Sequence, residues 1–118
     1  MNDYKDLKVW SLSIDFVESI YRVIKAFPKE ETYALSNQIQ RAVVSIPSNI
    51  AEGASRNSNK EFVQFLYIAL GSASEVETQL IIARRLNFVH SIESELQALT
   101  SIRKMLNSLI ASIKRKIN

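Results

Sequence analysis

Apolar residues recur every three or four positions along most of the chain, which is the spacing of one face of an α-helix. The clearest case is the segment LSNQIQRAVVSIPSNIAEGASR, residues 35–56. Its apolar positions follow at intervals of four, four, three, four and four: Leu35, Ile39, Val43, Ile46, Ile50 and Ala54. We expect this face to lie against a core, on a helix over residues 31–55. Glu30 and Glu31 stand at its start, where the helix dipole favours negative charge.

Three further segments show the same period, and we predict helices over about residues 8–27, 59–86 and 91–116. Pro28 disfavours the α conformation at the residue before it, and Ser58 with Glu61 forms the pattern of a capping box. Ser91 is placed to cap the fourth helix. On the first helix the expected buried residues are Trp10, Ile14, Val17, Ile20 or Tyr21, Ile24 and Phe27.

Pro47 lies inside the predicted second helix. Proline lacks the N–H that would bond the Val43 carbonyl, and its ring presses on that turn. Because the apolar spacing keeps its phase across Ile46 and Ile50, one bent helix is favoured over a stop at Ser45 and a restart. Four helices with short links predict an all-α fold, an antiparallel up-down four-helix bundle with a proline-kinked second helix, formed by residues 1–118 as a single domain.

Two features of the predicted helices bear on how they pack. Gly71 and Ser72, in the middle of the third helix, would let another helix approach closely. The fourth helix is apolar over a wider arc than a bundle needs, because Ala98, Ile102, Met105 and Leu109 extend its main seam sideways. A wide arc suggests a second buried contact, and we expect a homo-oligomer.

Composition narrows the classes of protein. The chain has 118 residues, 47% hydrophobic and 23% charged, with 2 Gly and 2 Pro, which fits one helical domain. It has no cysteine, which removes disulfides, thiolate metal sites and cysteine nucleophiles. The start MNDYKDLKVW lacks the apolar core of a signal peptide, and no run approaches the ~18 apolar residues of a membrane span. We expect a cytoplasmic protein without a membrane segment or cofactor.

Charge is distributed unevenly, because residues 78–118 hold 7 basic and 2 acidic side chains while residues 1–77 hold 8 and 10. A basic last third could contact phosphate. Alternatively, these side chains complement helix dipoles and keep an apolar helix in solution. The candidate nucleic-acid-binding residues are Arg84, Arg85, Arg103, Lys104, Lys114, Arg115 and Lys116.

A polar stripe runs beside the apolar face of the second helix and has a counterpart on the third. Arg41 and Glu52 are eleven residues apart, so they share an azimuth but are separated by about 16 Å along the axis and cannot pair. The stripe is interpreted as a structural polar network at a helix or subunit contact, or else as a ligand or nucleic-acid site. Its members are Gln38, Arg41, Ser45, Asn49, Glu52, Ser72, Glu75 and Gln79.

Catalytic and metal chemistry has little support. A di-metal centre in a bundle needs Glu-x-x-His motifs, and the chain has one histidine, His90, so no metal site is predicted. Arg85 and His90 fit the R-x4-H spacing that resembles the active motif of a superfamily of small helical RNases. Arginine to hold phosphate and histidine for acid–base work is sensible for RNA cleavage. This pair is kept as an alternative, and no catalytic residue is predicted.

Several stretches together carry a resemblance to a known family: DLKVW near the start, residues 27–56, residues 60–80 and the helix after them. The most specific are SIPSNIAEG and ALGSASEVETQL. They closely resemble the 23S rRNA intervening-sequence proteins, small bacterial four-helix bundles, some encoded inside insertions in ribosomal RNA genes. That family is also similar to the accessory protein of diversity-generating retroelements, a five-subunit barrel that contacts nucleic acid and reverse transcriptase.

The resemblance implies a homo-oligomer, expected to be a pentamer, without known catalysis. The residues that match the family by position are structural signatures with no assigned chemical role: Gln38, Arg41, Ser45, Pro47, Asn49, Glu52, Gly53, Gly71, Ser72 and Glu75. The leading functional hypothesis is a non-enzymatic oligomeric bundle that binds RNA or a nucleoprotein partner through its basic residues. The alternatives are a pure protein-interaction or assembly module, and a small RNase using Arg85 and His90.

Overall fold

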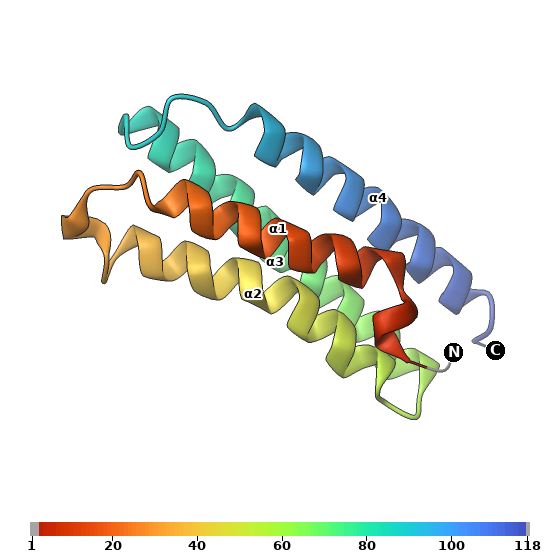
Figure 1. Ribbon diagram of the computed structural model, residues 1–118. Helices are drawn as coiled ribbons and strands as arrows, with labels where there is room; N and C mark the ends of the chain where they lie inside the picture. Colours follow the sequence, from red (N-terminus) through yellow and green to blue (C-terminus); the bar gives the residue numbers. More distant parts are fainter. Residues whose placement is uncertain (1–2, 118) are drawn as a thin grey trace.

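The structure is a computed structural model that describes residues 3–117. Within this range the chain forms α-helices and two short 3-10 turns, and it has no strand. The all-α class and the number of long helices are therefore confirmed (Figure 1). The elements are η1 Tyr4–Asp6, α1 Lys8–Ile24, η2 Lys29–Glu31, α2 Leu35–Ala54, α3 Asn59–Arg85 and α4 Glu93–Lys114.

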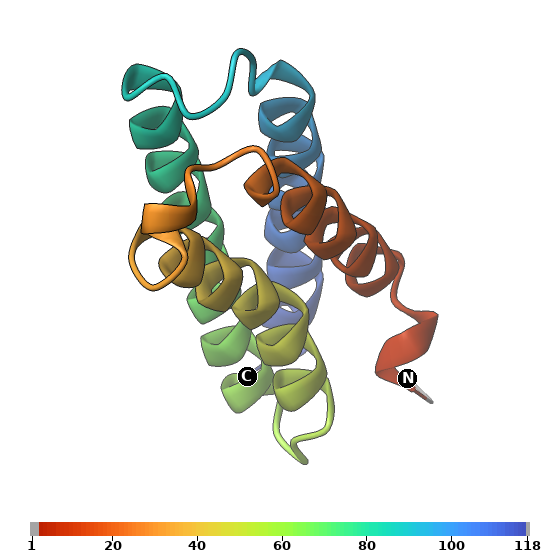
Figure 2. The ribbon, with the colours of Figure 1, turned by 60° about the vertical axis from the view of Figure 1, so that its left-hand side comes forward.

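The four helices form an elongated bundle of 49 × 23 × 20 Å. Helix α2 packs on α1 and α3, and α4 packs on the same two helices from the other side (Figures 1 and 2). Helices α2 and α4 make no close backbone contact with each other. Among the helix pairs that do touch, the contact between α2 and α3 is the most extensive and that between α1 and α4 is the smallest.

The buried face of α2 follows the apolar spacing of its sequence. Ile39, Val43, Ile46 and Ile50 are completely buried, so the prediction for this segment is confirmed. They pack in one core cluster with residues of the other three helices. The neighbours that are completely or almost completely buried include Ile20 from α1, Leu66, Val76 and Leu80 from α3, and Leu99, Ile102 and Leu106 from α4.

The prediction for α1 is partly wrong, because the helix is rotated from the expected face. Ile14 and Tyr21 are exposed by 37% and 42%, while Val9 and Phe16 are buried. The sequence of α1 has two overlapping apolar series, and the buried one contains Ser13. Ser13 tolerates burial since its hydroxyl donates to the Val9 carbonyl at 2.7 Å.

The structure shifts several predicted helix ends. Helix α2 begins at Leu35 rather than 31, because residues 29–31 form the separate η2 turn. Glu31 therefore lies before the helix, where its Oε1 accepts the Leu35 N–H at 3.3 Å and pairs one free N–H group of the first helical turn. Helix α1 ends at Ile24, three residues before the predicted end at 27. Helix α2 is continuous through Pro47, which is buried.

Gly53, and not Gly71, is the glycine that allows two helices of this chain to approach. A Cβ built at Gly53 would lie 2.7 Å from Phe65 Cβ and 3.2 Å from the Phe62 carbonyl oxygen. A Cβ at Gly71 would meet nothing within 4 Å. The expected close approach at Gly71 is therefore absent within one chain, because that residue faces outward from α3.

The link between α3 and α4 begins with a left-handed residue. Asn87 has φ of 63°, and the Phe88 N–H bonds the Ala83 carbonyl at 2.9 Å, as in a Schellman-type helix end. Phe88 then packs against Phe27, with ring centroids 5.7 Å apart. This turn fixes where the chain leaves α3, directly after Arg84 and Arg85.

Candidate functional site

The predicted basic residues do not form one patch. Arg84 and Arg85 are the last two residues of α3, whereas Lys114 ends α4 and Arg115 and Lys116 follow it. In Figure 1 these helix ends lie at opposite ends of the bundle. Helix α4, which runs between them, has 22 residues and is about 33 Å long. A single short nucleic-acid segment therefore cannot contact all of them on one chain.

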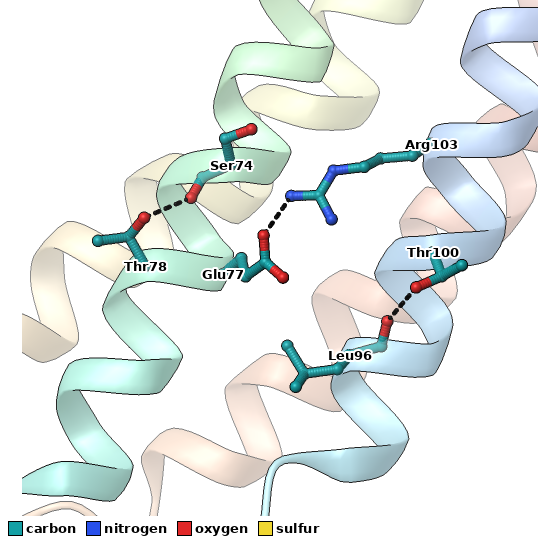
Figure 3. Close-up of polar contacts among 6 residues, drawn as sticks. All are labelled: Ser74, Glu77, Thr78, Leu96, Thr100 and Arg103. Atoms are coloured by element: carbon teal, nitrogen blue, oxygen red, sulfur yellow. Dashed lines mark hydrogen bonds and ion pairs between the residues drawn. The ribbon is translucent and has the colours of Figure 1, made fainter.

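Arg103 is tied to a neighbouring helix. Its Nη2 donates to Glu77 Oε1 at 2.8 Å, joining α4 to α3 (Figure 3). The two side chains are 27% and 38% exposed. In the same region the hydroxyls of Thr78 and Thr100 donate to carbonyls of their own helices, at 2.9 and 3.0 Å. Arg103 is thus occupied in a helix–helix ion pair, while the next residue, Lys104, is exposed.

Lys114 also has a partner within the chain. Its Nζ donates to the Tyr67 hydroxyl at 2.8 Å and lies 5.1 Å from the centroid of that ring. This contact holds the end of α4 against α3 through a hydrogen bond and a cation–π interaction. Arg115 and Lys116 remain exposed beyond it.

The polar stripe on α2 and α3 meets at one pair of serines. Ser45 Oγ and Ser72 Oγ are 2.8 Å apart, and this hydrogen bond joins the two helices. The Asn49 side-chain amide donates to both Ser45 Oγ and the Ser45 carbonyl, each at 2.8 Å. These contacts form a small network in which the half-buried polar groups are paired.

Next to this network lies an open groove of about 310 Å³, lined by Gln38, Arg41, Ala42, Ser45, Glu75 and Gln79. Among the described residues, neither Arg41 nor Glu75 makes an ion pair or side-chain hydrogen bond. Gln79 Oε1 is buried and has no hydrogen-bond partner in the described part of the chain. Several polar groups that line this groove thus have no hydrogen-bond or ion-pair partner within the described part of the chain.

Glu52 is the predicted network member that lies apart from this groove. Its Oε2 is 3.1 Å from Arg56 Nη2, and Arg56 also reaches Glu61 at 3.7 Å. These exposed ion pairs connect the end of α2 with the start of α3. The structure therefore brings together the other members of the predicted network and leaves Glu52 at the helix end.

His90 lines a polar cleft of about 520 Å³ between the end of α1 and the link from α3 to α4. Arg22, Asn87, Ser91 and Glu95 also line this cleft, but Arg85 does not. The two residues of the R-x4-H pattern therefore do not line the same cleft. In residues 3–117 no group of three or more His, Asp or Glu is placed to hold a metal ion.

Two apolar features lie at the surface, and sequence reasoning indicated the first, through Met105 and Leu109 in the wide apolar arc of α4, but missed the second. One is a groove of about 300 Å³ between α1 and α4, lined by Leu7, Lys8, Val9, Lys104, Met105, Ser108 and Leu109. The other is a set of individually exposed apolar side chains on α2 and α3, namely Val44, Ile68 and Ile82. For the α3 residues a signal existed, because Ile68, Glu75 and Ile82 recur at seven-residue intervals.

The fold and the surface define a class: an all-α helical-bundle protein with a polar seam between two helices and basic helix ends. Residues 5–108 match the family of 23S rRNA-intervening sequence proteins, and the chain belongs to this family. It is similar to a crystal structure from Bacteroides thetaiotaomicron of a protein with unknown function from the S23 ribosomal protein family. The sequence identity is 32% and the TM-score 0.79, covering 86% of this chain and 97% of the other.

A comparison with curated proteins finds no match. The family and the solved relative therefore establish the fold and the kinship of the chain, and the relative is itself of unknown function. None of the helices within residues 3–117 is long and apolar enough to cross a membrane.

Proposed function

We propose that this protein is a non-enzymatic, homo-oligomeric helical bundle that binds RNA or a nucleoprotein partner through its basic last third. The observation that supports this most directly is a set of exposed cationic side chains that form no ion pair within the described residues. They are Arg84, Arg85, Lys104, Arg115 and Lys116. The name of the family, which refers to ribosomal RNA, agrees with a polyanionic partner.

The distribution of these residues favours an extended or structured partner. Arg84 and Arg85 close α3 at one end of the bundle, and Arg115 and Lys116 follow α4 at the other, about 33 Å away by the length of α4. Each pair offers a small number of phosphate contacts. Few contacts bind weakly alone, but copies held in one oligomer would engage the same RNA together. Binding would then gain from effective concentration.

The test is binding of a fluorescently labelled, structured RNA measured by anisotropy at about 50 and about 200 mM salt. We expect affinity to fall as salt rises, because each phosphate contact releases a counterion. Replacing Arg115 and Lys116 together by serine should weaken binding and lower the slope of log K against log salt by about 1 to 2.

The matched control replaces two exposed basic residues outside the last third, Lys25 and Lys29, by serine. That variant should bind as the unchanged protein does. Absence of binding at about 50 mM salt would remove the RNA hypothesis. An equal loss in both double variants would show that only overall charge matters.

Assembly is the second part of the proposal. The resemblance implies a pentamer, and the apolar groove between α1 and α4, with the exposed Val44, Ile68 and Ile82, supplies surface for contacts between copies. Light scattering coupled to gel filtration measures the mass directly. A monomer across the micromolar range would contradict it.

The finer architecture also belongs to this proposal. We infer that consecutive helices alternate in direction, as in an up-down bundle. We also infer that α2 bends at Pro47, because proline removes one helical hydrogen bond and its ring crowds the Val43 carbonyl. Residual dipolar couplings along α2 would show two axis directions, before and after Pro47. A single direction would contradict the bend.

The apolar surfaces also favour a second candidate, an assembly module whose ligand is a protein. Co-purification from the native host separates the two, since RNA would accompany the protein in the first case and a polypeptide in the second. An RNase would instead degrade RNA during the binding assay. His90→Ala would abolish such cleavage, whereas we expect RNA decay to be unchanged by it.

A further inference from the structure

The open polar groove between α2 and α3, here called the α2–α3 groove, has two walls of opposite hydrogen-bonding character. Helix α3 contributes Glu75 and Gln79, which are four residues apart and therefore lie one turn apart on the same face. Both side chains carry acceptor oxygens. Helix α2 contributes Arg41, whose guanidinium is a fork of N–H donors without an acceptor. A ligand that fits between these walls must present donors toward α3 and acceptors toward Arg41.

The three polar side chains have unused bonding capacity. Arg41 and Glu75 are exposed, and neither forms an ion pair in residues 3–117. Gln79 Oε1 is buried and has no hydrogen-bond partner in the described part of the chain. An unpaired buried acceptor costs free energy, and the last torsion of a glutamine side chain rotates with little restriction. A donor in the groove can therefore turn this oxygen outward and pair it.

Among the components of RNA, a guanine base has the matching pattern of donors and acceptors. Guanine presents two neighbouring donors, N1–H and the N2 amino group, on its Watson–Crick edge, and two neighbouring acceptors, O6 and N7, beside them. Adenine and cytosine each have a single amino group on these edges, and uracil has one N–H between two carbonyls. A phosphate does not fit beside Glu75, because the carboxylate repels it. Guanine alone can donate to both acceptors on α3 and accept from Arg41.

The position of the groove on α3 connects it with the basic end of that helix. Arg84 and Arg85 follow Gln79 by five and six residues, which is about 8 to 9 Å along the helix axis. Their side chains are exposed and form no ion pair within the described residues. A short single strand with its base in the groove can thus bring a neighbouring phosphate near these arginines.

We propose that the α2–α3 groove binds a guanine base, whose N1–H and N2 amino group donate to Glu75 and Gln79 and whose O6 and N7 accept from Arg41. The base belongs to an unpaired guanosine of RNA, and the adjoining phosphates contact Arg84 and Arg85. This inference rests on the proposed RNA binding and adds the nucleotide that the protein recognises. The basic residues give affinity for any RNA, whereas the groove gives preference for one base.

Short fluorescent RNAs that differ at one position test the preference for guanine. The reference is a single strand of uridines, and the second strand has one guanosine at its centre. In anisotropy titrations at about 50 mM salt, the guanosine strand should bind at least about fivefold more tightly. Inosine at the same position lacks the N2 amino group, and 7-deazaguanosine lacks N7, so each should lose part of this preference. Equal binding of all four strands would overturn the proposal.

Glu75→Gln tests the acceptor wall of the groove. The amide keeps the size of the side chain but removes its charge and one acceptor oxygen, so the preference for guanosine over uridine should fall to within about twofold. Binding of the all-uridine strand should stay the same or become slightly tighter, because a negative charge is removed. Glu18→Gln makes the same change at an exposed position of α1 and should retain the full preference. If Glu75→Gln retains it as well, the groove does not recognise the base.

Replacing Arg84 and Arg85 together by serine tests the phosphate contacts. Affinity for the uridine and guanosine strands should fall by the same factor, because phosphate contacts carry no sequence information. The preference for guanosine should therefore persist in this variant. Unchanged affinity for both strands would show that the adjoining phosphates lie elsewhere.

Competition with guanosine monophosphate distinguishes RNA from a free nucleotide as the source of the base. If RNA is the ligand, the monophosphate should compete at least about tenfold less well than the unlabelled guanosine strand, since it makes fewer phosphate contacts. Adenosine monophosphate should not compete at the same concentration. Equal competition by guanosine monophosphate and the strand would assign the groove to a free guanine nucleotide and overturn the RNA part of the proposal.

Failure of this inference can be told apart from failure of the proposed function. If the strands bind equally well and guanosine monophosphate does not bind, RNA binding stands and the assignment of the groove is wrong. If no RNA binds but guanosine monophosphate binds and Glu75→Gln abolishes this, the proposed function fails and the guanine site stands. If neither binds, both are wrong.

Discussion

Gly53 shows how strongly one residue can set the distance between two helices. Its missing side chain allows α2 to lie against Phe62 and Phe65 of α3, with a hypothetical Cβ only 2.7 Å from Phe65 Cβ. We predict that Gly53→Ala destabilises the fold by about 1 to 3 kcal/mol, since α2 and α3 must separate or distort. Urea denaturation followed by circular dichroism measures this change.

Gly71→Ala is the matched control, because it makes the same substitution at an open position of the adjacent helix. It should stabilise the single chain by about 0.5 to 1 kcal/mol through helix propensity. Equal effects of the two substitutions would contradict the packing described for Gly53.

The ion pair between Glu77 and Arg103 crosses from α3 to α4 at 2.8 Å while both side chains remain partly exposed. Because water screens such a pair, we predict a coupling energy of no more than about 1 kcal/mol. A double-mutant cycle with Glu77→Ala and Arg103→Ala isolates this term. A coupling well above that value would mean that the pair is more desolvated than the structure indicates.

At the scale of the elements, the end of α3 depends on the left-handed conformation of Asn87. Asn87→Gly should preserve or slightly raise stability, because glycine adopts positive φ without a steric penalty. Asn87→Val should destabilise by about 1 to 2 kcal/mol, since a β-branched residue is strained there. Thermal unfolding of the pair measures the difference, and equal melting temperatures would argue against this turn.

For the whole molecule, the uneven contacts among helices predict uneven local stability. Helices α2 and α3 share the most extensive contact, whereas α4 touches only α1 and α3, and each of these contacts is smaller than the one between α1 and α2. Amide hydrogen exchange should therefore be slowest in the middle of α2 and α3 and fastest in α4, because α4 shares the fewest contacts with the other helices and subglobal opening begins where fewest contacts are lost. Uniform protection of all four helices would indicate a single cooperative unit.

Much of the fold was predictable from the chain alone. The apolar period of residues 35–56 correctly predicted which side of α2 is buried, and the Ser58 side chain caps α3 by accepting the Glu61 N–H at 3.2 Å, as its position indicated. These features depend on neighbours within one or two helical turns, so a linear pattern contains them.

Other features depend on which helices meet, and only the tertiary structure decided them. Arg103 and Lys114 appear in the sequence as free cations, but each finds a partner 26 or more positions away, at Glu77 and Tyr67. The sequence suggested a close helix approach at Gly71, yet Gly53 is the glycine that faces another helix of its own chain. The sequence determined the helices and their dry faces through local periodicity; the relative rotation of the helices decided which polar and small residues meet, because that rotation is set by side-chain packing across the whole core.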